Sequence, residues 1–167
     1  MCAIQIQSVI ETPRLRLRAP QLSDAGIIAK LLNDHEVARM TTSIPHPYGV
    51  EDAQAFLSGM DDKSYVIDHP RYGPIGSVGF SPGENGQTEI GYWLGKPYWG
   101  SGFATEAARA ALPHADRRHV MARHFADNPA SGEVLIKAGF LYTGDVSLTP
   151  SVARSGVVPS RWMVWLA

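Results

Sequence analysis

The chain has 167 residues, a length that suits one domain with a sizeable core and leaves no room for two. Hydrophobic residues make up 44% of it and charged residues 19%, as in ordinary soluble domains. The formal net charge of -1 argues against a surface built to coat nucleic acid.

Membrane and secretory signals are absent from the sequence pattern. No apolar run approaches the roughly 18 residues that cross a bilayer, and the start lacks the basic and apolar regions of a secretory signal. The single cysteine, Cys2, cannot form an internal disulfide and fits a reducing compartment. We therefore expect a cytoplasmic protein with no membrane partner.

The first half of the chain predicts one strand and two helices. Residues 14–19 alternate between arginine and apolar residues, which indicates a strand whose three arginines form a solvated face. Helical spacing of apolar residues predicts a helix over 25–33 and a second over 50–60. Prolines and a glycine break the segment 41–49 into a loop.

The second half predicts six strands and two further helices. The strands are expected at 64–68, 74–81, 87–94, 119–126, 140–148 and 161–166. The helices are expected at 105–112 and 128–137, and the segment 149–160 is expected to be a loop. This order predicts an α+β (mixed α/β) fold, with about seven mostly antiparallel strands and about four helices in a single sheet-centred domain.

The stretch YWGSGFATEAARAA (98–111) places two glycines just before a predicted helix. Glycines there let the backbone approach an anion, and the helix start presents about four unpaired N–H groups. A P-loop is excluded because Phe103 and Ala104, not a Lys–Ser/Thr pair, follow the second glycine. A dinucleotide fingerprint is disfavoured because Thr105 occupies its third small position. A plain strand-to-helix turn and a pyrophosphate-binding turn for coenzyme A remain.

Three blocks of sequence decide between these alternatives: TPRLRLRAPQLSDA, EIGYWLGKPYWGSGFATEAARA and ADNPASGEVLIKAGF. Together they resemble the GCN5-related N-acetyltransferase (GNAT) superfamily, in the branch similar to ribosomal-protein N-terminal acetyltransferases. The resemblance covers roughly residues 11–166 and implies one N-acetyltransferase domain over 1–167, with strands splayed at a cofactor cleft. It departs from the superfamily motif at Pro97, where Gln or Arg is usual, a departure that this branch often shows.

The resemblance implies acetyl-CoA as co-substrate, without a metal, and assigns residues to its binding. They are Tyr92, Trp93, Leu94, Trp99, Gly100, Ser101, Gly102, Phe103, Ala104, Thr105, Asn128 and Ser131. The side chains of Tyr92 and Trp93 are equally explained as core aromatics. Asn128 is equally explained as a helix N-cap.

Two residues are candidates for catalysis. Glu89 lies on the strand that, by resemblance, receives the acetyl group, and a half-buried carboxylate there can serve as a general base. Many superfamily members carry a tyrosine acid seven residues after the asparagine, where this chain has Leu135. Ser131 is therefore assigned to hydrogen-bond the leaving thiolate.

The expected function is acetyl-CoA-dependent N-acetyl transfer, directly to a primary amine, with a protein N-terminus favoured by the branch. A small amine, amino acid or antibiotic is an alternative acceptor, and a non-catalytic acyl-CoA sensor is the alternative class. Acceptor walls are expected from loops 33–50 and 149–160, including Asp34, Glu36 and His46. A homodimer is plausible, and the six scattered histidines do not predict a metal site.

Overall fold

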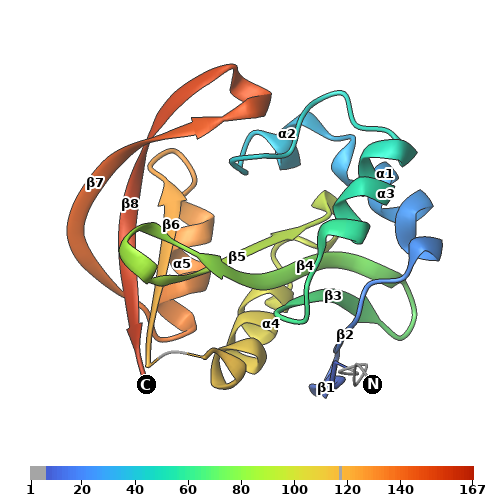
Figure 1. Cartoon of the computed structure of the whole chain (residues 1–167), viewed down its shortest axis with the longest axis horizontal. Coiled ribbons are helices and arrows are strands. Elements are labelled where there is room, and N and C mark those ends of the chain that lie inside the picture. Colours follow the sequence, from blue (N-terminus) through green and yellow to red (C-terminus); the bar gives the residue numbers. More distant parts are fainter. Residues whose placement is uncertain (1–6, 117) are drawn as a thin grey trace, which may run out of the picture.

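The computed structural model describes residues 7–116 and 118–167, so Cys2 lies outside the described residues. Its eight strands form one sheet in the order β1-β2-β3-β4-β5-β6-β8-β7 (Figure 1). The strands are β1 (Ile10–Glu11), β2 (Arg16–Arg18), β3 (Ser64–His69), β4 (Gly73–Pro82), β5 (Thr88–Leu94), β6 (His119–Phe125), β7 (Leu141–Ser151) and β8 (Gly156–Leu166). All neighbours pair antiparallel except β5 and β6, which confirms the predicted mixed fold.

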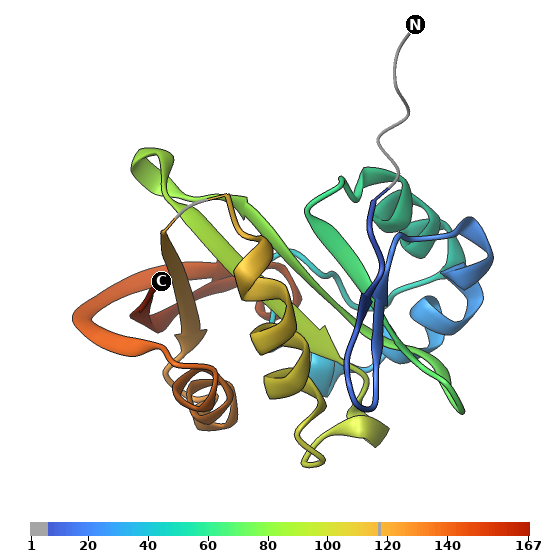
Figure 2. The same ribbon diagram turned by 90° about the horizontal axis from the view of Figure 1, so that it is seen from below.

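Helices cover both faces of this sheet (Figures 1 and 2). They are α1 (Ala25–Leu32), α2 (His35–Ala38), α3 (Val50–Gly59), α4 (Phe103–Ala111) and α5 (Pro129–Lys137). The first three pack with Val66 and Trp93 in one core cluster, and α4 and α5 pack with Ile90 and Leu94 in the other. No helix in the described part of the chain is long and apolar enough to span a membrane.

The parallel contact between β5 and β6 is very short. It consists of two rungs, Thr88 opposite Val120 and Glu89 opposite Met121. Beyond them β5 pairs only with β4, and β6 pairs only with β8. The two strands therefore diverge, as the resemblance implied, and leave facing backbone edges without strand partners.

The predicted loop over 149–160 is wrong. Most of this segment forms the end of a long β7–β8 hairpin, in which Leu148 lies opposite Pro159 and Pro150 opposite Val157. The two prolines suggested a loop, but β7 is the outermost strand of the sheet, where a missing N–H costs no ladder hydrogen bond. Pro159 directly precedes Ser160, the first residue of β8 that pairs with β6, so Pro159 itself has no partner in β6.

Close packing of β4 against β5 depends on Gly76. A Cβ atom at this position would lie 2.1 Å from the backbone oxygen of Trp93, a contact that real structures do not tolerate. We expect Gly76→Ala to lower the free energy of unfolding by about 3 kcal/mol, because β5 must move to make room.

Urea unfolding would measure this change, with Gly26→Ala as the matched control. Gly26 lies in α1, and a Cβ atom added there would have nothing within 4 Å, so the same substitution should stabilise the protein by up to about 1 kcal/mol. Equal stability of the two variants would contradict the close approach at Gly76.

Candidate functional site

Alternation along β5 sends its side chains to two different environments. Ile90 and Leu94 are buried in the core beneath α4 and α5. Glu89, Gly91 and Trp93 line a cavity on the opposite face, as the period of two predicted, and Tyr92 also lines it. One strand therefore separates a face covered by α4 and α5 from a face with an open cavity.

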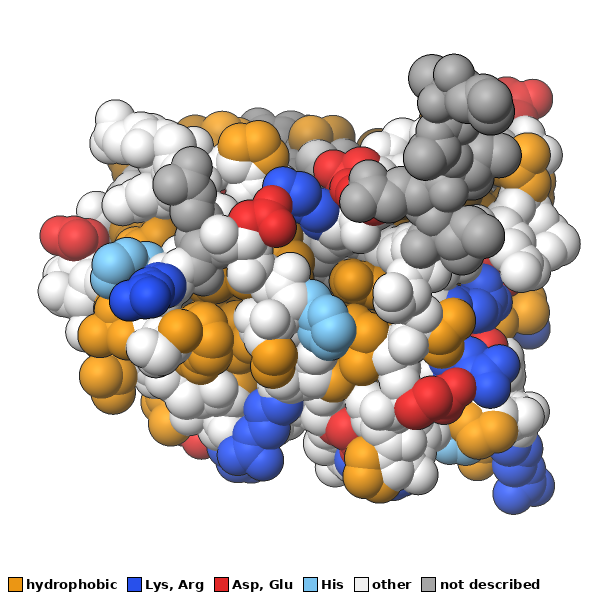
Figure 3. Space-filling model, turned by 60° about the horizontal axis from the view of Figure 1, so that its bottom comes forward, with side chains coloured by type: hydrophobic (Ala, Val, Ile, Leu, Met, Phe, Trp, Pro, Cys, Tyr) orange, Lys and Arg blue, Asp and Glu red, His pale blue; other side chains and the backbone are white. Residues whose placement is uncertain are grey.

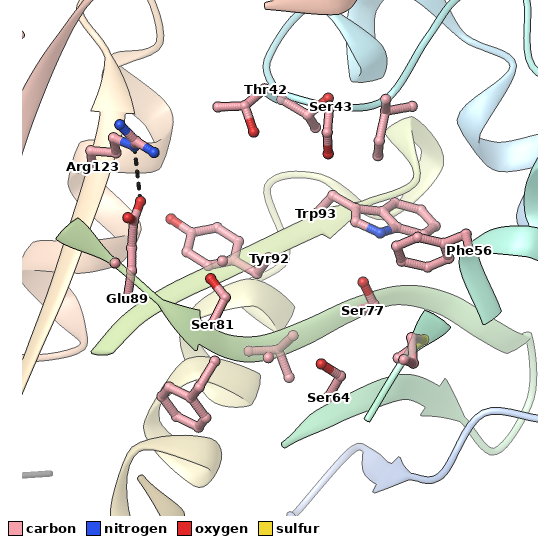
Figure 4. A pocket seen from close by; sticks show the side chains of 18 of the residues that line it. Thr42, Ser43, Phe56, Ser64, Ser77, Ser81, Glu89, Tyr92, Trp93 and Arg123 are labelled. Atoms are coloured by element: carbon pink, nitrogen blue, oxygen red, sulfur yellow. Dashed lines mark ion pairs between the residues drawn. The ribbon is translucent and has the colours of Figure 1, made fainter. Parts of the chain in front are cut away.

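The cavity has a volume of about 670 Å³ and lies between the sheet and the segment 40–44 (Figure 4). Serine and threonine hydroxyls from both sides enter it, and Trp93 and Phe56 are among the residues that give it apolar surface. Trp93 is 7% exposed, and its Nε1 is buried without a hydrogen-bond partner among the described residues. The lining is thus mostly uncharged.

Glu89 and Arg123 supply an ion pair at the point where β5 and β6 separate (Figure 4). Arg123 Nε lies 2.9 Å from Glu89 Oε1, and the Glu89 side chain is 16% exposed. Burial raises the pKa of Glu89 above its ordinary value; the charge of Arg123 opposes the rise, and the Glu84 carboxylate adds to it. A carboxylate with a raised pKa is a better proton acceptor for an amine than an ordinary one.

The glycine turn leads from β5 into α4. Gly100 and Gly102 both have left-handed backbone conformations, with φ of 78° and 80°, and Gly102 is the N-cap of α4. The helix begins at Phe103, two residues before the predicted start, so Ala104 and Thr105 belong to its first turn. The unpaired N–H groups of this turn can hold an anion, and a side chain on either glycine would strain the backbone.

Trp99 and Arg14 fix this turn from two sides. The exposed Trp99 ring donates its Nε1 proton to the carbonyl of Leu94 at 2.9 Å, closing the loop on the end of β5. Arg14 Nη1 donates to the carbonyl of Ser101 at 2.8 Å, and the guanidinium lies 4.5 Å from the centre of the Phe103 ring.

The predicted solvated arginine face is wrong for Arg18 alone. Its side chain is 15% exposed and pairs with Asp24 and Asp68. Arg14 and Arg16 are exposed as predicted, and they pair with Glu106 and Glu11. The partners lie up to 92 residues away, a separation that a local pattern does not reveal.

Asn128 and Ser131 lie at the start of α5, which follows β6. The Asn128 side chain accepts the backbone N–H of Ser131 at 3.3 Å, which confirms its role as N-cap. The Ser131 hydroxyl lies 2.7 Å from the Tyr92 hydroxyl, a contact that joins α5 to β5 across the divergence of the two strands. Burial raises the pKa of Tyr92 to about 12, so the phenol stays protonated and able to donate.

Leu135, at the position of the usual tyrosine acid, is 1% exposed in the core. A tyrosine from another element, Tyr92 of β5, contacts Ser131 instead. This contact was not predicted from the sequence. Hydrophobic side chains lie across the middle of the face drawn in Figure 3, with both basic and acidic side chains around them.

The cavity wall from segment 33–50 differs from the prediction. Its lining begins at Met40 and ends at Ile44, whereas Asp34 caps α2 by accepting the N–H of Glu36. His46 contacts His35 with ring centres 5.3 Å apart. None of the three predicted wall residues lines the cavity, because α2 occupies the segment expected to be loop.

The tip of the β7–β8 hairpin holds the upper wall of the cavity in place. Ser151 Oγ donates to the carbonyl of Thr41 at 3.1 Å, and the backbone N–H of Val152 donates to the carbonyl of Thr42 at 3.0 Å. Arg154 donates to both carboxylate oxygens of Asp127 and to the carbonyl of Arg39. The hairpin therefore positions the wall without lining the cavity.

Within residues 7–116 and 118–167, no group of three or more His, Cys, Asp or Glu side chains is arranged to hold a metal ion.

The site thus combines a divergent parallel strand pair, a left-handed glycine turn before a helix and a capped second helix. The family model for the acetyltransferase (GNAT) domain matches residues 14–141, and the chain belongs to this family. This finding confirms the resemblance to the GNAT superfamily.

Individual relatives and structures agree with this assignment. The chain is 33% identical over 113 residues to an uncharacterized N-acetyltransferase p20 of Bacillus licheniformis, covering 62% of this chain and 63% of that protein. It is 33% identical over 76 residues to the ribosomal-protein-serine acetyltransferase of Escherichia coli (strain K12), covering 42% of each. The chain thus spans less than two thirds of the length of these two relatives. Mycobacterium smegmatis RimJ in complex with CoA-disulfide has the same fold, with a TM-score of 0.81 at 18% identity, covering 96% of this chain and 88% of that one.

The carboxylate of Glu106 connects the glycine turn to the β1–β2 region. Burial disfavours its charge, but hydrogen bonds from Thr12, from the Arg14 backbone and from the Arg14 side chain outweigh burial and lower its pKa. Its stabilising contribution is therefore complete above the unfolded-state pKa of about 4.3 and is lost as pH falls through the lower folded-state value.

We expect Glu106→Gln to lower the free energy of unfolding at pH 7 by about 1–2 kcal/mol and to flatten its decline below pH 4. Glu11→Gln is the control, because the Glu11 side chain is 62% exposed and should contribute little. Chemical unfolding at several pH values would measure both, and identical acid dependence in the variant and the parent would contradict this account of Glu106.

Proposed function

We propose that the protein is an acetyl-CoA-dependent N-acetyltransferase that transfers the acetyl group directly to a primary amine, with a protein N-terminus as acceptor. The observation that carries the proposal is the divergence of β5 and β6, with the glycine turn at the end of one strand and Glu89 at their last shared rung. The similarity to a ribosomal-protein-serine acetyltransferase supports the choice of acceptor.

The residues of the chain fit coenzyme A on independent grounds. Gly100 and Gly102 hold backbone conformations that favour glycine, in a turn suited to the pyrophosphate. The edge of β5 at Tyr92, Trp93 and Leu94 has no strand partner on the β6 side and suits the amides of the pantetheine arm, which would pair with it as an added strand does. When bound, acetyl-CoA supplies a thioester to the site.

Transfer requires removal of one proton from the amine and stabilisation of the leaving thiolate, and the chain has a group for each. Glu89 accepts a proton from the amine as the C–N bond forms, and the carbon–sulfur bond breaks as the tetrahedral arrangement collapses. The Ser131 hydroxyl is assigned to donate a hydrogen bond to the leaving sulfur, and the Tyr92 hydroxyl lies 2.7 Å from it, a contact in which either oxygen can donate. No covalent attachment to the protein is needed.

Isothermal titration with acetyl-CoA, beside NAD and ATP, tests the cofactor. We expect selective one-to-one binding of acetyl-CoA, and a loss of at least about a hundredfold in affinity for Gly102→Val, because a β-branched side chain strains a left-handed position and fills the cradle.

Gly86→Val is the matched control, because Gly86 has φ of 72° with open space around it and does not line the cavity. Its affinity should stay unchanged. Preference of the parent protein for NAD or ATP, or normal binding by Gly102→Val, would refute this assignment of the turn.

Thiol release with a panel of peptides and amines tests catalysis. We expect Glu89→Gln to lower kcat by about a hundredfold, since the general base is lost, with an unchanged Kd for acetyl-CoA. Glu84→Gln removes the other carboxylate of the cavity and should change kcat by less than about threefold. Acetyl-CoA binding without transfer to any amine would instead favour a sensor module.

A further inference from the structure

Arg123 presents an unusual set of free donors to the cavity. An arginine carries five N–H donors, yet Glu89 is the one described residue with which this guanidinium forms an ion pair. Its Nε lies 2.9 Å from Glu89 Oε1 in an ion pair, but the Nε–H is poorly aligned with the carboxylate. The side chain is 28% exposed and lines the cavity (Figure 4).

Structural ion pairs elsewhere in this chain are built differently. Arg18 uses all three of its nitrogens on Asp24, Asp68 and the carbonyl of Ala19. Arg154 grips Asp127 with two nitrogens. We expect an arginine that only stabilises the fold to use several of its N–H groups in hydrogen bonds, as these two do. A buried N–H donor without a partner costs free energy of folding.

The orientation of Arg123 is nevertheless fixed. Its guanidinium lies 4.8 Å from the centre of the Trp162 ring, a cation–π contact from β8. The strand β6 holds its backbone next to the last rung shared with β5. The free donors are thus held in one place beside the candidate base, rather than swinging in solvent.

A base next to an array of N–H donors suits a particular acceptor group. In an α-amino carbonyl unit, the amine nitrogen and the carbonyl oxygen are about 3 Å apart, from standard bond lengths. The amine can therefore meet Glu89 while the carbonyl oxygen meets the adjacent guanidinium. The amine at the end of a lysine side chain or of a polyamine has no oxygen at this distance.

Resting on the acetyl transfer proposed above, we propose that Arg123 binds the carbonyl oxygen next to the acceptor amine, so that the site selects α-amino carbonyl compounds over ω-amines. The rest of the lining agrees, because the carboxylates in it are Glu84 and Glu89 alone among the described residues. Two carboxylates, one of them already paired, do not balance a polycationic acceptor.

The test compares acceptors that differ in the position of one carbonyl. Trialanine amide carries an α-amino carbonyl, the β-alanyl-dialanine amide moves the carbonyl one carbon away, and Nα-acetyl-lysine amide offers an ω-amine. We expect kcat/KM for the α-amino peptide to exceed kcat/KM for the other two acceptors by about ten- to a hundredfold. This is the range that one hydrogen bond to a charged group typically contributes.

Variants of Arg123 then locate the source of this preference. Arg123→Lys keeps a cation near Glu89 but loses the planar fork, and Arg123→Gln loses the charge as well. In both, the preference for the α-amino peptide should fall below about threefold, mainly through KM, with an unchanged Kd for acetyl-CoA. Arg161→Gln is the control, because it removes an exposed arginine of β8 that stacks on Tyr142 and does not line the cavity.

The pH profile separates binding from fold effects. The charge of Arg123 opposes the rise in the Glu89 pKa, so Arg123→Gln should move the acidic limb of kcat/KM to higher pH, and Arg123→Lys should move it less. Acceptors are therefore compared at the plateau of each profile. Unaltered selectivity in both variants at that plateau would overturn the role of Arg123.

The same comparison distinguishes two kinds of α-amino acceptor, a peptide N-terminus and a free amino acid. Faster acetylation of trialanine amide than of free alanine supports a peptide N-terminus, the reverse supports an amino acid whose carboxylate Arg123 binds, and either supports the inference. Equal rates for α- and ω-amines overturn the inference but leave the acetyltransferase intact. Acetyl-CoA binding with no transfer refutes the proposed enzyme, and the selectivity falls with it.

Discussion

The two-rung contact between β5 and β6 is the constraint on which the rest of the site depends. Beyond these two rungs, β5 still pairs with β4 and β6 still pairs with β8, but β5 and β6 no longer pair with each other. Their facing edges therefore have backbone groups that can bind an extended ligand. Both strands also lead, at their carboxyl ends, into helices whose N-termini open beside the divergence. Ligands of open sheets with parallel strands bind at such ends, where unpaired N–H groups and helix dipoles favour negative charge.

The divergence of β5 and β6 brings the candidate groups together at one cavity. Glu89, Tyr92 and Trp93 all line it, and the Tyr92 hydroxyl also lies 2.7 Å from the Ser131 hydroxyl at the start of α5. Glu89 offers a proton acceptor, and Tyr92 and Ser131 offer a pair of hydroxyls. These are the two kinds of group that acetyl transfer to an amine can use.

Local signals predicted the fold and several local conformations of the candidate site. The Asn128 cap and the left-handed glycines are set by a few adjacent residues, and the period of β5 identified the face of Glu89. Contacts between distant segments escaped prediction, because no pattern within a short window encodes them. Arg14 with Glu106 and Glu89 with Arg123 are such contacts. The β7–β8 hairpin was missed for another reason, since its prolines lie where they remove no ladder bond.

The tip of the β7–β8 hairpin contacts both the cavity wall and the residue before the start of α5. Arg154 holds Asp127, the residue directly before the Asn128 cap, and also the carbonyl of Arg39, directly before the cavity wall. The pKa of Asp127 is lowered first by its hydrogen bonds to Arg154, with burial opposing and the charges of Arg154 and Arg39 assisting. This clamp is therefore charged on both sides at neutral pH. Because one guanidinium binds both segments, it fixes the position of the cavity wall at 40–44 relative to the start of α5. The wall that an acceptor would contact is therefore held at a fixed distance from the helix that carries Ser131.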